Sequence, residues 1–275
     1  MRKYTSAARM PLWKWILCLG GGLFLFFLLY GFSQMGSSLP QSRWLRMGIS
    51  LAAALLGLLL YAVWTNLTER RPVMELALKR TWGDLGLGLL LGILYFGLVV
   101  GLMALAGSYA ITGAQFHALP QVEAFLGFLM VAAYEEIIFR GILFRLIDDR
   151  WNTAVALIVS ALFFGAVHLF NPGATLWSGL AIAIEAGLLL GAAYKYSGTL
   201  WLPIGIHWAW NYVQGNILGF AVSGTSVSDK VFSPIISGPD WITGGVFGAE
   251  ASVPAVVIGV LLTVILLFAR KREAR

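Results

Sequence analysis

Three groups of polar residues interrupt the apolar stretches of this chain, and their side chains could together catalyse a hydrolysis. Ionisable residues are rare at bilayer depth and mark functional sites when they occur there. Two carboxylates, two imidazoles and an amide supply proton transfer and hydrogen-bond donation. The groups read Glu135-Glu136-x-x-x-Arg140, Phe164-x-x-x-His168 and His207-x-x-x-Asn211.

The first group predicts two adjacent carboxylates with different environments. Glu136 and Arg140 are four residues apart, so they share a helix face and can form an ion pair. Glu135 is rotated by about 100° from Glu136. One carboxylate can then be held ionised by Arg140 while the other faces a cavity and transfers protons. The alternative is a purely structural ion pair that locks two helices together.

The other two groups predict hydrogen-bond donors. His207 and Asn211 lie on one helix face, where their side chains could stabilise a tetrahedral oxyanion. An interhelical polar clamp is the alternative for this pair. His168 ends an apolar segment and could instead be a neutral, hydrogen-bonded helix-end residue. Glu185 is a further polar residue in an apolar segment; it could line the same cavity, carry a proton, or be neutral and satisfied by a neighbouring helix.

The elements that carry these residues are predicted to be membrane helices. The chain has 275 residues, of which 59% are hydrophobic and 12% charged, with a mean hydropathy of +0.81. Soluble domains carry about 25% charged residues, and a membrane helix needs roughly 20 apolar residues. We therefore expect an all-α polytopic bundle with about eight spans. They are approximately 14–33, 48–65, 85–106, 122–146, 152–169, 175–195, 199–220 and 253–269.

The basic residues predict the orientation of this bundle. With both termini in the cytoplasm, fifteen lysines and arginines lie on the cytoplasmic side and only Arg43, Arg46 and Lys230 lie opposite. Because these residues sit in loops rather than on one stripe, nucleic acid is not expected as a partner. The fifteen are Arg2, Lys3, Arg9, Lys14, Arg70, Arg71, Lys79, Arg80, Arg145, Arg150, Lys195, Arg270, Lys271, Arg272 and Arg275.

Three regions are expected along the chain. Residues 1–120 hold the first three spans and a basic interfacial connector, 121–220 hold the catalytic core, and 221–275 hold an external loop and the last span. Two glycine pairs in the third span, Gly88 with Gly92 and Gly97 with Gly101, predict close helix packing.

The ordered set of three motifs resembles the CPBP family, the CAAX-processing and bacteriocin-processing intramembrane proteases also called Abi proteins. The resemblance covers residues 121–215. It implies an eight-helix intramembrane endopeptidase with a conical cavity that opens to one membrane face, in a prokaryotic cell membrane. The substrate would be a peptide or a membrane-protein segment, and the lipid bilayer would be the other partner.

Carried over by position, the resemblance assigns each polar residue a role. Glu135 would activate a water molecule that His168 holds, and His207 and Asn211 would form the oxyanion hole. The residues that would support this site are Glu136, Arg140 and Phe164.

Metal dependence and catalysis itself remain open at this point. We expect no required cofactor, and if zinc is bound its ligands would be Glu135, His168 and His207. The single cysteine, Cys18, excludes a cysteine-based metal site and an internal disulfide framework. Two alternatives use the same residues: a non-catalytic membrane immunity or binding protein, and a transporter or proton relay built on Glu185 and Glu135.

Overall fold

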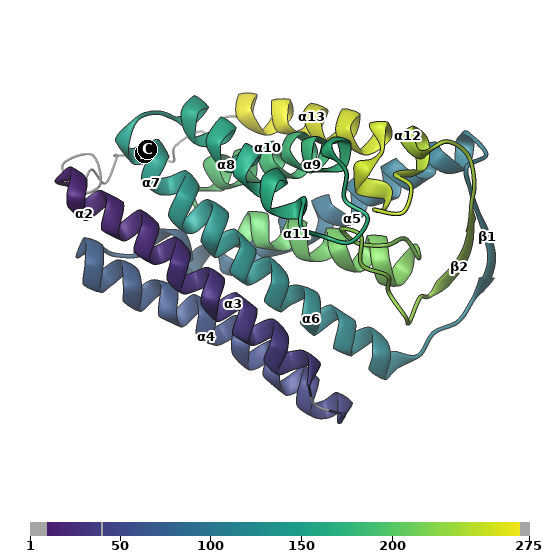
Figure 1. Cartoon of the computed structure of the whole chain (residues 1–275), viewed down its shortest axis with the longest axis horizontal. Coiled ribbons are helices and arrows are strands. Elements are labelled where there is room, and N and C mark those ends of the chain that lie inside the picture. The colour runs from purple at the N-terminus through teal and green to yellow at the C-terminus, as the bar shows by residue number, and fades with distance from the viewer. Residues whose placement is uncertain (1–9, 40, 270–275) are drawn as a thin grey trace.

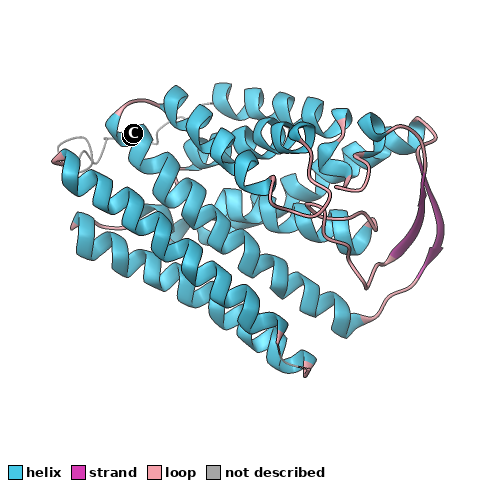
Figure 2. Ribbon diagram, in the orientation of Figure 1, coloured by secondary structure: helices cyan, strands magenta, loops and turns pink. Residues whose placement is uncertain are grey.

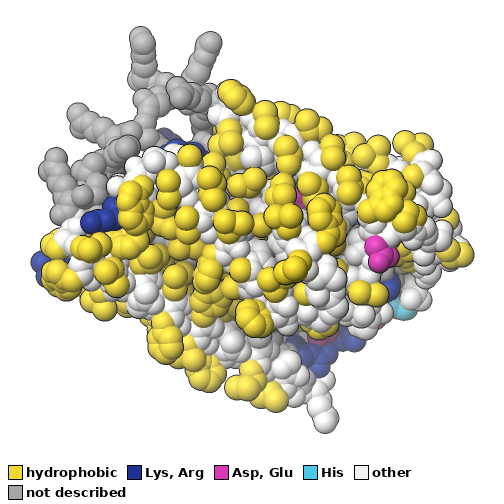
Figure 3. All heavy atoms as spheres, turned by 45° about the horizontal axis from the view of Figure 1, so that its top comes forward, with side chains coloured by type: hydrophobic (Ala, Val, Ile, Leu, Met, Phe, Trp, Pro, Cys, Tyr) yellow, Lys and Arg dark blue, Asp and Glu magenta, His cyan; other side chains and the backbone are white. Residues whose placement is uncertain are grey.

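The computed structural model describes residues 10–39 and 41–269, which fold into a bundle made mostly of helices (Figures 1 and 2). Four helical segments in this part of the chain are long and apolar enough to cross a membrane. Hydrophobic side chains are spread over the face seen in Figure 3, as expected for contact with lipid. The four are Leu12–Ser38 (α2, Leu12–Ile16; π-helical turn, Leu17–Gly21; α3, Gly22–Ser38), Arg43–Glu69 (α4), Met74–Leu105 (which includes α5, Thr81–Leu105) and Leu176–Ser197 (α9, Leu176–Ile182; π-helical turn η5, Ala183–Gly187; α10, Leu188–Ser197).

The remaining predicted spans are also helical, but they are shorter or interrupted by charged residues. Two of them, α8 and α13, are short apolar helices. The helix from Ala118 to Arg150 is continuous and contains the first polar motif. The elements of these spans are α6 (Ala118–Glu136), the π-helical segment η4 (Ile137–Phe144), α7 (Arg145–Arg150), α8 (Thr153–His168), α11 (Trp201–Tyr212) with the π-helical turn η6 (Val213–Ile217), and α13 (Val253–Phe268). The short helix α12 (Asp240–Thr243) lies between the last two predicted spans.

A small antiparallel sheet departs from the all-α prediction. Strand β1 (Tyr109–Ala114) pairs with β2 (Phe232–Ile236), with Tyr109 opposite Ile236. The strands come from two connections that are far apart in the sequence, and both lie at the end of the bundle opposite α2 and α7 (Figure 1). Pairing between distant segments leaves no local signal in either segment, so the sequence of region 221–252 indicates only an external loop.

Helix α11 lies at the centre of the bundle, and α5 approaches it closely. Every residue of α11 from Leu202 to Asn211 is buried. A Cβ atom at Gly88 would lie 2.4 Å from the Leu202 carbonyl oxygen, and one at Gly92 would lie 2.5 Å from the Ile206 carbonyl oxygen. The predicted close packing is confirmed for this first glycine pair, whose absent side chains let the backbones meet.

The second glycine pair does not pack in this way. A Cβ atom at Gly97 or Gly101 would meet nothing within 4 Å. Within this chain the prediction of close packing is therefore wrong for the second pair, which faces away from neighbouring helices of the bundle.

Replacing Gly92 with alanine should destabilise the protein by roughly 1–3 kcal/mol, because the added methyl group forces α5 away from α11. Gly101→Ala is a matched control on the same helix, and we expect it to be neutral or stabilising by up to about 1 kcal/mol. Thermal unfolding of both purified variants in detergent measures the difference. Equal stabilities would show that the close approach of α5 and α11 does not limit folding.

Candidate active site

A cavity of about 420 Å³ collects the polar motifs from three separate helices. Glu135 comes from the end of α6, His168 from the end of α8, and His207 and Asn211 from α11. The four side chains that were expected to do chemistry therefore line one space. Apolar residues supply much of the remaining wall, among them Phe27, Phe128, Val131, Val167 and Val227.

Glu135 lines the cavity, and one of its two carboxylate oxygens has no hydrogen-bond partner among the described residues. Its Oε1 accepts a hydrogen bond from the Tyr30 hydroxyl at 2.9 Å. Its Oε2 has no hydrogen-bond partner among the described residues and lies 3.8 Å from His207 Nε2. Tyr30 in turn accepts from the Gln34 amide at 3.0 Å. One oxygen is thus fixed by α3, while the other is buried and has no hydrogen-bond partner among the described residues.

Glu136 has a different environment, as the 100° rotation predicts. It is fully buried, and its Oε1 accepts from Arg140 Nη1 at 2.8 Å. The same oxygen lies 2.9 Å from His207 Nδ1. The ion pair with Arg140 is therefore formed, and Glu136 also orients the imidazole from α11. This second contact joins α6 to α11 and could not be predicted from spacing within one helix.

Arg140 connects the first motif to η5. Its Nη2 donates to the carbonyl oxygens of Ala186 and Gly187, each at 3.2 Å. Its guanidinium lies 4.7 Å from the centre of the Phe164 ring, which is within cation–π range. Both η4, which carries Arg140, and η5, which carries the acceptors, are π-helical, a local widening that is frequent at functional sites.

The hydrogen bond of His168 through Nδ1 determines that Nε2 is the nitrogen that can accept a hydrogen bond. Nδ1 lies 2.7 Å from the Phe164 carbonyl oxygen, which can only accept, so Nδ1 carries a proton. In the neutral ring Nε2 is then an acceptor and can receive a hydrogen bond from water. The Phe164 ring packs 4.5 Å from the His168 ring, between it and Arg140.

The hydrogen bond of His207 changes what this residue can donate. Because Nδ1 donates to the Glu136 carboxylate, the Nε2 of a neutral ring carries a lone pair and cannot donate to an oxyanion. Donation from Nε2 requires the doubly protonated ring. In that state the cluster of Glu135, Glu136, Arg140 and His207 is charge-balanced, which favours burial of all four groups together.

Glu185 does not belong to the residues that line this cavity. It is fully buried, and its Oε2 lies 2.6 Å from the Tyr95 hydroxyl of α5. The Tyr95 oxygen also lies 2.8 Å from the carbonyl oxygen of Ala255 in α13. Since a hydroxyl has one proton for these two acceptors, a protonated Glu185 completes the arrangement. Glu185 therefore faces α5 and α13, because the helical rotation turns it away from the cavity.

The zinc ligands considered from the sequence do not assemble into a metal site. In the part of the chain that the structure describes, no three His, Cys, Asp or Glu side chains are grouped so that they could hold a metal ion. Glu135, His168 and His207 share the cavity, and each imidazole is oriented through Nδ1 by a bond to another protein group. In this arrangement of the described residues the three side chains are not grouped as metal ligands.

Comparison with known protein families matches the part of the chain that carries all three motifs. Residues 117–213 match the family model described as "Type II CAAX prenyl endopeptidase Rce1-like". Residues 117–213 are therefore similar to an Rce1-like domain. No curated protein and no solved structure matches the chain in the corresponding comparisons.

The matched residues include Glu135, His168, His207 and Asn211, and the family that they resemble is described as one of endopeptidases. Together with the four long apolar helical segments of the described residues, the match favours an integral membrane protein.

Two residues beside the Rce1-like domain were missed by sequence reasoning. Tyr30 lies in the first predicted span, and its four-residue spacing from Gln34 was a signal that could have identified a polar face. Glu250 lies in the region expected to be an external loop. It borders a small space that His168, His207 and Asn211 also line.

Glu250 holds the segment that covers the cavity. The Ser223 backbone N–H donates to Glu250 Oε1, and Ser223 has a φ of 46°, a left-handed conformation that costs energy in a non-glycine residue. Burial raises the pKa of the Glu250 carboxyl to about 7, while hydrogen bonds involving Ser223, Gln214 and Trp210 act in the opposite direction. The carboxylate is therefore a stronger acceptor for Ser223 above pH 7 than below it.

Glu250→Gln should raise KM about tenfold, because the Ser223 N–H then donates to a neutral amide oxygen, a weaker acceptor than a charged carboxylate. Wild-type kcat/KM should also rise as the pH passes through about 7, as Glu250 ionises, and this step should be absent in the variant. Kinetics between pH 5.5 and about 8.5 test both points. Asp240→Asn, at an exposed position in the same loop, is the control and should keep the step. A wild-type profile that is unchanged in Glu250→Gln would contradict this role.

Proposed function

We propose that this protein is an intramembrane endopeptidase of the CAAX-processing type that hydrolyses a peptide bond without a metal ion. The observation that carries the proposal is the position of Glu135 Oε2, which lies 3.8 Å from His207 Nε2 in a cavity that His168 and Asn211 also line. Among the described residues this oxygen has no hydrogen-bond partner. We further propose that about eight helices span the membrane, with both termini in the cytoplasm.

The reaction begins with a water molecule between Glu135 and His168. Glu135 Oε2 accepts a proton from the water as its oxygen attacks the carbonyl carbon of the substrate, and His168 Nε2 accepts the second hydrogen bond and fixes the direction of attack. Tyr30 keeps the carboxylate in place through Oε1. A general base of this kind contributes about 10²–10⁴-fold to the rate.

The negative charge that forms on the carbonyl oxygen is stabilised from α11. His207 Nε2–H and the Asn211 side-chain amide donate to this oxygen, and Glu136 balances the imidazolium through Nδ1. Collapse of the tetrahedral intermediate breaks the C–N bond, and Glu135 returns its proton to the leaving nitrogen. The products are a carboxylic acid and an amine, and transfer of the acid proton to the amine leaves a carboxylate and an ammonium group.

Asn211→Ala should lower kcat by about 10²–10³-fold, the usual effect of removing one oxyanion donor. The assay is cleavage of a library of internally quenched peptides by the purified protein in liposomes, with mass spectrometry of the products. Treatment with 1,10-phenanthroline should leave the rate unchanged. Complete loss of activity with the chelator, restored by zinc, would contradict the metal-free mechanism, and binding without any turnover would support the non-catalytic alternative.

A further inference from the structure

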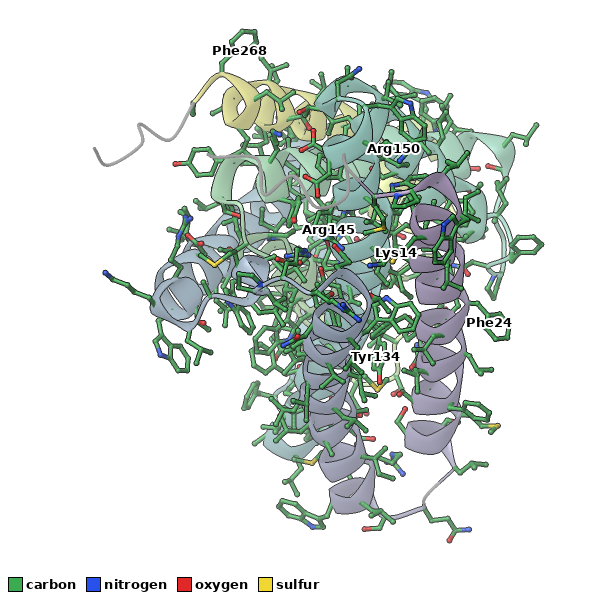
Figure 4. All side chains as sticks on the ribbon, turned by 90° about the vertical axis from the view of Figure 1, so that its left-hand side faces the viewer. Lys14, Phe24, Tyr134, Arg145, Arg150 and Phe268 are labelled. Atoms are coloured by element: carbon green, nitrogen blue, oxygen red, sulfur yellow. The ribbon has the colours of Figure 1, made fainter. Side chains whose placement is uncertain are left out.

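The basic residues and the catalytic cavity lie at opposite ends of the bundle. At one end, Arg145 pairs with Glu69 of α4, and Arg80 donates to the Ser197 carbonyl at the end of α10. Arg150 donates to the Met10 carbonyl just before α2. Figure 4 views the bundle from this side, with Lys14, Arg145 and Arg150 labelled. These contacts bring together helix α7, the starts of α2 and α5, and the ends of α4 and α10. We call this face of the bundle the basic end.

The cavity opens toward the other end. It is continuous with a vestibule of about 370 Å³, because Gln34, Phe128, Val131, Thr225 and Val227 line both spaces. The vestibule continues to the end of α3 and to the first turns of α4 and α6.

A cluster of charged residues marks the rim of the vestibule. Arg43 and Arg46 both pair with Glu123, at 2.9 Å and 2.5 Å. The rim is completed by Ser228 and Asp229. Both belong to the region 221–252, which we call the covering loop. No residue of the basic end lines either space.

The distribution of lysine and arginine assigns these two ends to the two sides of the membrane. Within the described residues the basic end carries eight of them, whereas the rim end carries Arg43, Arg46 and Lys230. Short loops rich in lysine and arginine stay in the cytoplasm, and acidic residues contribute little to this preference. The excess of lysine and arginine at the basic end does not depend on the basic residues of the two chain termini, which are left out of this count. The eight are Lys14, Arg70, Arg71, Lys79, Arg80, Arg145, Arg150 and Lys195.

We infer that the catalytic cavity opens on the extracytoplasmic side of the membrane and that its substrate is a peptide segment presented on that side. The apolar walls formed by Phe27, Phe128 and Val131 select apolar side chains next to the cleaved bond. The substrate class is thus an exported peptide or an extracytoplasmic membrane-protein segment, not a cytoplasmic carboxy-terminal peptide. This assignment of a substrate rests on the proposed function, whereas the orientation does not.

Cysteine labelling measures the orientation independently of catalysis. Cys18 is the only cysteine and is buried, so Cys18→Ala gives a cysteine-free background. Ser228→Cys at the rim and Lys79→Cys at the basic end are both at exposed positions. A membrane-impermeant maleimide added to intact bacterial spheroplasts should label the Ser228→Cys protein and not the Lys79→Cys protein. In inverted membrane vesicles the labelling should be reversed.

The opposite labelling pattern, or labelling of both positions from one side, would overturn the inference. Failure of the proposed function would instead leave the labelling as expected while no peptide is cleaved. For the substrate, a membrane-impermeant quenched peptide with apolar residues at its centre should be cleaved by spheroplasts that carry the wild-type protein and not by those that carry Glu135→Gln. Cleavage that occurs only in inverted vesicles would place the substrate in the cytoplasm and overturn the inference.

Discussion

Glu135→Gln should reduce peptide cleavage by at least about 10²–10⁴-fold, because an amide cannot accept a proton from the attacking water. The substitution keeps the size of the side chain, and the amide oxygen can still accept the hydrogen bond from Tyr30. The variant should therefore fold and insert normally, and its substrate should remain bound rather than be released as product. Single-turnover measurements in liposomes would separate the lost chemical step from binding.

Glu185→Gln is the matched control for this experiment. Glu185 is also a buried glutamate in an apolar helix, but it contacts Tyr95 and not the cavity. We expect cleavage by this variant to stay within a few-fold of the wild type. Full activity in Glu135→Gln would remove the proposed base, and equal losses in both variants would indicate a general requirement for buried carboxylates, as in the proton-relay alternative.

Residue spacing predicted those parts of the site that lie within one helix. The four-residue spacing of Glu136 and Arg140 gave an ion pair, which is formed at 2.8 Å. His207 and Asn211 likewise point into one cavity from one face of α11. Helical geometry is local, so a single sequence is sufficient for such pairs.

Contacts between helices could not be predicted in this way. Counting residues from the cytoplasmic ends places Glu135 about 20 Å and His207 about 12 Å into the membrane at 1.5 Å per residue. The structure nevertheless places His207 Nε2 3.8 Å from Glu135 Oε2. Simple counting treats each helix as straight and upright, whereas η4, which lies between Glu135 and the end from which its depth is counted, is π-helical and rises less per residue than an α-helix. The bond between Glu136 and His207 depends on this relative placement.

The covering loop was the least predictable part of the site. Its sequence is polar and rich in glycine and serine, which indicates a loop but not its position. The strand pairing of β2 with β1 and the bond from Ser223 to Glu250 bring this loop over the cavity. Both are long-range contacts, and each is made by residues that have no distinguishing pattern of their own.

Arg140→Met should destabilise the folded protein by about 3–5 kcal/mol, the usual cost of removing one partner from a buried ion pair. Arg140 and Glu136 are both fully buried, so the carboxylate of Glu136 would lose its charge partner inside the bundle. The carbonyl oxygens of Ala186 and Gly187 would also lose their contacts with Arg140 Nη2. Chemical unfolding in detergent measures this effect, and Lys79→Met at an exposed position should change stability by less than about 0.5 kcal/mol.

The double variant Arg140→Met, Glu136→Gln separates the charge effect from the packing effect. If the uncompensated carboxylate is the main cost, neutralising it should recover a large part of the stability lost in Arg140→Met. Catalysis should not recover, because the neutral amide that replaces the Glu136 carboxylate cannot balance a protonated His207 at Nδ1. A double variant less stable than Arg140→Met alone would show that packing against Phe164 and η5, rather than charge, is the main contribution of Arg140. Recovered stability without recovered activity would instead show that Glu136 has two separable roles. It forms an ion pair with Arg140 that stabilises the fold, and it accepts the Nδ1 proton of His207 in a hydrogen bond during the reaction.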